Sequence, residues 1–337
     1  MRRLALIAAA LSALCLLPAP ARAQVVTVKL GTLAPDGSAW HSLLKEMAEK
    51  WSEASGGKVK LRIYPGGVAG DEGDMVRKMR VGQLTAAAVT VVGLHDIDPS
   101  PQAIATPGLI GDQDEWDYVF EKMAPVWEKR LRDKGFVTLT WGDTGRVYMF
   151  FKKEIRRPGD ARGARVFAWA GDPAAAEAQK LAGFQPVVIS STDMMASLST
   201  GMIEGFATTP IMAFTARWYE PAKHMPDTSW GHLPGATIVS KETWDKIPAD
   251  LQAKLMAISR EYGLKVNKEV VRLQGDAIAQ MKKNGLKVLT LNAAEQKAWA
   301  EAAERTWTVV RGGVCPAEAF DEVKRVRDEY RAAKGKK

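Results

Sequence analysis

The chain has 337 residues, of which 46% are hydrophobic and 26% charged, and its formal net charge is +8. This composition is ordinary for a globular protein and excludes a disordered chain, a collagen-like repeat and a disulfide scaffold. The length suggests two domains. With two cysteines and four scattered histidines, neither a metal nor a cofactor is expected. No run of Lys and Arg marks a nucleic-acid groove, so nucleic acid is not an expected partner.

The first 23 residues have the pattern of a cleavable secretory signal peptide. Arg2 and Arg3 form a positive start, residues 4–17 are an uncharged apolar run, and Ala21-Arg22-Ala23 is a small-x-small cleavage site. A transmembrane anchor is disfavoured because the run is too short to span a bilayer comfortably. We therefore expect a periplasmic protein whose single remaining thiol is Cys315.

After residue 24, segments typical of strands alternate with segments typical of helices. Period-two alternation or short apolar runs predict strands at residues 25–33, 59–63, 86–92, 136–141, 147–151, 165–168, 186–189, 236–240 and 287–291. Helical spacing of apolar residues predicts helices that begin after Ser38 and at about residues 71, 113, 173 and 191, and one over residues 212–219. A mostly helical region follows from 241, in which Asn292 caps one helix and the last helix follows Pro316. This order predicts an α/β fold whose sheet has a large parallel component and helix-covered faces.

The motifs of common enzymes are missing from the sequence. There is no Walker loop, no His-Glu-x-x-His pair and no Gly-x-Ser-x-Gly elbow, so nothing favours an enzyme. Two arginines, Arg146 and Arg165, follow turns and stand in or next to strands. A guanidinium group suits bidentate recognition of a carboxylate, but arginines are more often surface or ion-paired residues. Both readings stay open from residue type alone.

Several short motifs, in their order and spacing, resemble one family of transport proteins. They are Leu30-Gly-Thr-Leu-Ala-Pro35, Tyr64-Pro65, Met79-Arg-Val-Gly82, Gly163-Ala-Arg165-Val, Gly201-Met-Ile-Glu-Gly205 and Ser240-Lys-Glu-Thr-Trp244. The chain is similar to the periplasmic solute-binding subunits, of the DctP type, of tripartite ATP-independent periplasmic (TRAP) transporters. The resemblance implies a two-lobe solute-binding fold with a hinge and a long helix crossing both lobes. Lobe I would hold residues 24–143 and about 231–268, and lobe II residues 144–230 and about 269–333.

The same resemblance implies a ligand-binding site between the lobes. Arg165 falls where the family's carboxylate-binding arginine lies, Arg146 falls on a second ligand-side arginine position, and Glu72 falls on an acidic position that faces the cleft. Two threonines stand in place of the usual Asn-Pro element, and three aromatic residues would cover an apolar part of the ligand: Thr208, Thr209, Phe167, Trp169 and Trp218.

The predicted function is that of an extracytoplasmic receptor that captures an organic anion, a carboxylate with an apolar body. It would deliver this ligand to the membrane permease subunits. A subset of the family that this chain resembles adds a tetratricopeptide periplasmic partner and takes apolar ligands. The alternative is therefore a carrier of a neutral hydrophobic or lipid-like ligand, in which Arg165 would be structural and paired with Glu72.

Overall fold

The computed structural model describes residues 25–170 and 173–335. The predicted signal peptide lies outside these residues. Among the helices of the described chain, none is both long and apolar enough to cross a membrane.

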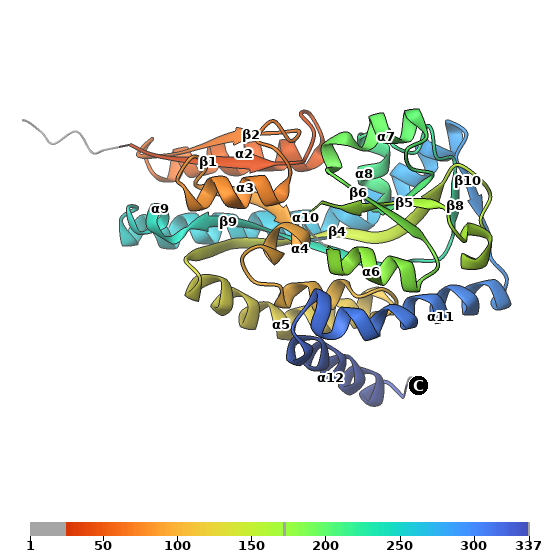
Figure 1. Ribbon diagram of the computed structural model, residues 1–337. Coiled ribbons are helices and arrows are strands. Elements are labelled where there is room, and N and C mark those ends of the chain that lie inside the picture. The colour runs from red at the N-terminus through yellow and green to blue at the C-terminus, as the bar shows by residue number, and fades with distance from the viewer. Residues whose placement is uncertain (1–24, 171–172, 336–337) are drawn as a thin grey trace, which may run out of the picture.

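One mixed sheet forms the centre of the protein, with helices above and below it (Figure 1). Eight strands follow the order β2-β1-β3-β9-β4-β7-β5-β6; in addition, β8 pairs with β4, and β10 pairs with β8. Their bounds are β1 Val26–Thr32, β2 Val59–Tyr64, β3 Ala86–Thr90, β4 Phe136–Phe151, β5 Arg165–Trp169, β6 Gln185–Ile189, β7 Gly205–Thr208, β8 His224–Pro226, β9 Gly231–Ser240 and β10 Lys287–Leu289.

The sheet has two parallel halves joined by two antiparallel strands. The first half is β2-β1-β3, and the second half is β7-β5-β6. Strands β9 and β4 lie between them and run antiparallel to each other and to their outer neighbours. Along β4 the pairing with β9 shifts register between Asp143 and Arg146, and the pairing with β7 begins at Tyr148. The lobe boundary expected between residues 143 and 144 falls at this shift, and the lobe division itself stays a prediction.

The helices of the first part of the chain are α2 (Ala39–Ala54), α3 (Glu72–Arg80), α4 (Val91–His95) and α5 (Gln113–Asp133). Those of the middle part are α6 (Pro173–Leu181), α7 (Met194–Thr200), α8 (Pro210–Thr215) and α9 (Lys241–Asp245). The last are α10 (Ala249–Lys283), α11 (Ala293–Val309) and α12 (Ala317–Ala333). Short helical turns occupy η2 (Ser100–Ala105), η3 (Pro158–Ala161), η4 (Ser191–Asp193) and η5 (Val310–Val314).

Local sequence explains where several helices begin. The Ser38 side chain accepts the His41 backbone N–H and caps α2, and Asn292 forms a capping box with Glu295 at the start of α11. Such caps satisfy backbone donors that the first helical turn leaves free. The starts of α2 and α11 are therefore the predicted ones, and α12 also begins directly after Pro316, as predicted.

The 35-residue helix α10 spans about 52 Å, at 1.5 Å per residue, and packs against α2, β4 and α8. It therefore touches elements of both halves, which confirms the predicted long crossing helix. Gly263 allows the close approach to β4, because a Cβ atom there would lie 2.7 Å from the Trp141 carbonyl oxygen.

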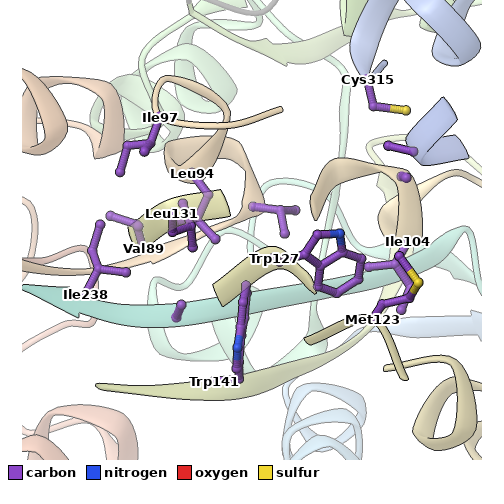
Figure 2. Close-up of a cluster of buried hydrophobic side chains, with 14 of the residues drawn as sticks. Val89, Leu94, Ile97, Ile104, Met123, Trp127, Leu131, Trp141, Ile238 and Cys315 are labelled. Carbon is purple, nitrogen blue, oxygen red and sulfur yellow. The ribbon is translucent and has the colours of Figure 1, made fainter. Parts of the chain in front are cut away.

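On the opposite side, α5 packs against β4 and α12, and α11 packs against α6 (Figure 1). A hydrophobic cluster fills the space between this layer and the sheet, with Trp127 of α5 and Trp141 of β4 at its centre (Figure 2). Their ring centroids are 5.8 Å apart.

Four predicted elements differ from the structure in type or extent. The strands expected at 136–141 and 147–151 form one strand, β4, because β9 pairs with it on both sides of the register shift. Val91 and Val92 begin α4 rather than end a strand, because the Thr90 side chain caps that helix. The helix expected at 212–219 is α8, which begins at Pro210 with Thr209 as its cap and ends at Thr215.

Candidate functional site

A cavity of about 150 Å³, here called cavity one, lies between the two halves of the sheet. Four of its lining residues are the last residues of strands: Thr32 of β1, Thr90 of β3, Trp169 of β5 and Thr208 of β7. Ligands of α/β proteins bind at the carboxyl ends of parallel strands, since the connecting loops leave a crevice there. The position of cavity one fits this rule for both halves at once.

The walls of cavity one are mainly aromatic and aliphatic. Helix α2 contributes Trp40 and Leu44, and α10 closes one side with Tyr262 and Val266. The remaining apolar lining residues are Leu33, Ala34, Ala88, Val89, Trp141, Met212, Trp218, Leu233 and Ala236, together with Gly142, Gly235 and Gly263. Among the residues that the structure describes, the lining of cavity one includes no lysine, arginine or histidine. Its charged members in this part of the chain are Glu72 and Asp143.

Glu72 begins α3 and is 2% exposed. Its carboxylate accepts hydrogen bonds from the Thr90 backbone N–H (2.9 Å), the Thr90 hydroxyl (2.7 Å) and the Gly93 N–H (2.8 Å). Burial raises the pKa of Glu72 to about 7, although these hydrogen bonds favour the charged form. Glu72 therefore lines cavity one, as predicted from the resemblance, and at the same time holds the turn between β3 and α4.

Asp143 lies in β4 at the register shift and is 6% exposed. Its carboxylate accepts the Gly145 N–H at 2.7 Å. Burial raises the pKa of Asp143 to about 6. Both acidic lining residues are therefore easier to protonate than ordinary carboxyl groups, which lowers the negative charge inside the cavity near neutral pH.

Directly beside cavity one, Asp71 connects helix α3, which stands between β2 and β3 of the first half of the sheet, to strand ends of the second half. It caps α3 in the first half and accepts hydrogen bonds from three residues that follow or end strands of the second half. The donors are the Trp169 Nε1–H (3.0 Å), the Ser190 hydroxyl (2.8 Å), and both the backbone N–H and the hydroxyl of Ser191 (2.8 Å each). Burial alone would raise the pKa of Asp71, but these hydrogen bonds outweigh it and hold the pKa below its usual range. We call this group the Asp71 latch.

Of the eight residues predicted to bind ligand, five line cavity one. Trp169 forms part of the wall at the latch, and Trp218 packs edge-on against Phe206 with centroids 5.9 Å apart. Thr208 ends β7, and the Thr209 hydroxyl accepts the Met212 N–H as the cap of α8. Glu72 is the fifth. Phe167 lines a neighbouring cavity instead: it stands on the same face of β5 as Trp169, which lines both cavities, but two residues further from the strand's carboxyl end.

Arg165 is the first residue of β5 and does not line cavity one. Its guanidinium donates to the Met202 carbonyl (3.1 Å) and the Gly201 carbonyl (3.0 Å), and lies 3.5 Å from the Glu204 carboxylate. Four residue steps along the strand, about 13 Å, separate its Cα atom from that of Trp169. Arg165 therefore lies away from cavity one, and its contact with a ligand stays a prediction. Its acidic partner is Glu204, not the Glu72 of the alternative.

Arg146 does not line cavity one either. Its Nη2 donates to the Gly111 carbonyl at 2.6 Å, and its backbone N–H donates to the Gln274 side chain at 2.9 Å. Its Nε is buried without a hydrogen-bond partner in the described part of the chain. Arg146 is thus close to the cavity wall in β4 but points its bonded end toward the loop before α5.

Sequence reasoning missed the residues that close the site. The sequence predicted Asp71 only as the start of a helix. No local sequence pattern indicates that its carboxylate accepts hydrogen bonds from the second half. Tyr262 and Gly263 belong to the helical region expected after residue 241, and neither they nor Trp40 of α2 were among the predicted ligand-binding residues. No group of three or more metal-ligating side chains is found in the described residues.

Comparisons with known proteins identify the family of this chain. The profile of DctP, described as bacterial extracellular solute-binding protein, family 7, matches residues 30–311. The C4-dicarboxylate-binding periplasmic protein DctP of Rhodobacter capsulatus is 26% identical over 298 residues, which cover 85% of this chain and 86% of that protein.

Solved structures agree on the fold. A TRAP periplasmic solute-binding protein of Sulfurospirillum deleyianum with bound succinate has a TM-score of 0.81 at 21% identity, covering 89% of this chain and 98% of that one. A second, from Desulfovibrio salexigens with bound orotic acid, has a TM-score of 0.82 at 19% identity, covering 90% and 98%. The chain belongs to family 7 of the bacterial extracellular solute-binding proteins, the DctP type of TRAP receptors. This membership confirms the predicted family and fold, and it confirms a solute receptor rather than an enzyme.

Proposed function

We propose that this member of solute-binding family 7 captures an uncharged, largely apolar ligand in cavity one and presents it to a membrane permease. The observation that carries the proposal is the chemistry of the wall: it is mainly aromatic and aliphatic with several hydroxyl groups, its charged residues are Glu72 and Asp143, and no cationic side chain of the described residues lines it. Of the two ligand classes that the sequence left open, the geometry favours the neutral one.

The physical argument is the cost of burying a charge. A carboxylate moved from water into an apolar cavity loses its hydration and must be compensated by a cation or by several donors. In cavity one it would instead face Glu72 and Asp143, and whatever negative charge these two groups keep near neutral pH would repel it. An apolar ligand gains about 25 cal/mol for each Å² of apolar surface removed from water. The threonine hydroxyls at the strand ends can orient one polar group on such a ligand.

The second candidate is the organic anion with an apolar body. It is favoured by the relatives, whose solved structures hold succinate and orotic acid. It is also favoured by the buried and unpartnered Nε of Arg146. An anion that uses Arg146 would have to reach beyond the residues that line cavity one.

Ligand capture would act through the relative position of the two halves. Cavity one takes wall residues from both halves, so a ligand that touches both binds the closed arrangement better than an open one. Only this differential affinity can shift the equilibrium toward closure. The closed receptor then presents one shape to the permease subunits, and a tetratricopeptide protein in the periplasm is a further proposed partner.

The test begins with native mass spectrometry of the purified mature protein, followed by denaturation and identification of any released molecule. Affinity for that molecule, or for a hit from a thermal-shift screen, is then measured for Arg165→Ala, Trp169→Phe and Trp169→Ala. We expect a neutral ligand, affinity within about twofold for Arg165→Ala because its ion pair is exposed, and a loss of more than tenfold for Trp169→Ala because the aromatic wall is removed. Trp169→Phe separates the ring from its N–H donor.

The proposal would be overturned if the released molecule were a stoichiometric carboxylate whose binding is lost in Arg146→Ala or Arg165→Ala but retained in Trp169→Phe. The ligand would then be the organic anion of the second candidate.

A further inference from the structure

A second cavity of about 200 Å³, cavity two, lies on the other side of Trp169. Trp169 and Leu233 line both cavities, so they form the partition between them. The other walls come largely from aliphatic side chains that take no part in cavity one, such as Val91, Ala178 and Val310. Nothing in the proposed function uses this space.

The most unusual residue of cavity two is His232 on β9. Its side chain is 2% exposed and stacks on Trp116, with ring centroids 4.5 Å apart and an interplanar angle of 10°. Neither ring nitrogen has a hydrogen-bond partner in the described part of the chain. Burial, with the nearby Arg146 charge, lowers the pKa of His232 to about 3. The ring is therefore neutral and offers one N–H donor and one nitrogen acceptor.

A second unmatched group lines the same cavity. The Gln179 side chain donates from Nε2 to the Phe167 carbonyl at 3.0 Å, which fixes the amide, while its Oε1 is buried without a partner. Buried polar groups in folded proteins are almost always hydrogen-bonded, because an unmatched one keeps its full desolvation penalty. Two such side chains on one apolar cavity indicate a partner that comes from outside the protein.

The chemistry of these groups selects the partner. Gln179 Oε1 can only accept, and the neutral imidazole of His232 donates at one nitrogen and accepts at the other. A hydroxyl group matches the hydrogen-bonding needs of both side chains, because it donates one hydrogen bond and accepts others. A carboxylate could accept the His232 N–H, but it has no proton to donate and would leave the Gln179 oxygen without a donor.

We propose that cavity two is a second binding site, for a small uncharged molecule that joins an apolar body to a hydroxyl group. The site does not depend on the ligand of cavity one, and its failure would leave the proposed function unchanged. Its volume suits a single ring, since a cavity of about 150 Å³ is known to accept benzene.

The test uses three probes that share one ring: benzyl alcohol, toluene and benzoate. Binding is followed through the imidazole resonances of His232 by NMR, and His224, which lines neither cavity, provides the reference resonance in the same spectra. We expect benzyl alcohol to shift the His232 signals saturably. Toluene should bind about tenfold more weakly, because it leaves both polar groups unmatched. Benzoate should bind more weakly than benzyl alcohol.

Variants assign the effect to the site. His232→Phe keeps the stack on Trp116 and Gln179→Leu keeps the volume, and each should reduce benzyl alcohol affinity about tenfold when binding is followed by ligand-observed NMR. His224→Phe is the matched control and should leave it unchanged. The proposal is overturned by no saturable shift of His232, by equal affinity for toluene and benzyl alcohol, by tighter binding of benzoate, or by unchanged binding in both cavity-two variants.

Discussion

Replacing Asp71 by Asn should weaken both the folded state and ligand binding, because it removes the charge of the Asp71 latch. In the structure the carboxylate accepts four hydrogen bonds from the second half, from Trp169, Ser190 and Ser191. Hydrogen bonds to a charged group contribute about 1.5–3 kcal/mol each and neutral ones about 0.5–1.5 kcal/mol. An amide also has one acceptor oxygen where the carboxylate has two.

From these values we expect Asp71→Asn to lower the free energy of unfolding by about 2–4 kcal/mol, since the four bonds share one group and are not additive. Where the latch forms only on closure, a loss of about 2 kcal/mol weakens ligand affinity about 30-fold. Urea unfolding followed by tryptophan fluorescence gives the first quantity, and calorimetric titration with the identified ligand gives the second.

The matched control is Asp74→Asn, on the same helix. Asp74 accepts the Asp71 backbone N–H and pairs with Arg77, both within the first half, so this variant keeps the latch. Equal effects of the two variants on stability and affinity would refute the reasoning.

The latch also carries a pH dependence. The folded-state pKa of Asp71 lies below its ordinary value of 3.8, so its stabilisation is fully present above about pH 4. It is lost as the pH falls through the folded pKa. The difference in stability between wild type and Asp71→Asn should therefore shrink in acid.

Three further outcomes follow from single residues. Gly263→Ala should destabilise the protein by about 1–3 kcal/mol, because the new Cβ would lie 2.7 Å from the Trp141 carbonyl oxygen. Gly275→Ala on the same helix meets open space and should stabilise it by up to about 1 kcal/mol; urea midpoints that move alike in the two variants would contradict this. Burial raises the pKa of Glu72 from 4.5 to about 7, so the native state holds its proton more tightly and Glu72 should make stability fall as pH rises across that interval. Glu72→Gln should flatten this part of the stability profile, and an unchanged slope would argue against it. Cys315 is buried and its pKa is raised to about 12, so a thiol reagent at pH 8 should label it only after unfolding, and rapid labelling of the native protein would contradict the burial.

Short-range patterns determined much of the fold. The alternation of Val59, Leu61 and Ile63 identified β2, and the caps Ser38 and Asn292 identified helix starts, because these signals depend on neighbours in sequence. Strand β7 was missed because four residues carry too little periodicity to detect. Two strands were expected where β4 is continuous, because its glycines resemble a turn until β9 pairs across them.

The sequence by itself also determined the family, through motifs spread over nearly the whole chain. Of the ligand-binding residues that it predicted, Glu72, Trp169, Thr208, Thr209 and Trp218 line cavity one. Only the tertiary structure decided what those residues face. Arg165 has the right group for a carboxylate, but its place at the start of β5 turns it toward Gly201 and Glu204, away from the cavity at the strand's other end. Asp71 and His232 depend on partners more than 80 residues away in the chain, in the latch and on Trp116. Residue type fixes which interactions a side chain can make, and the packing of distant segments fixes which of them it makes.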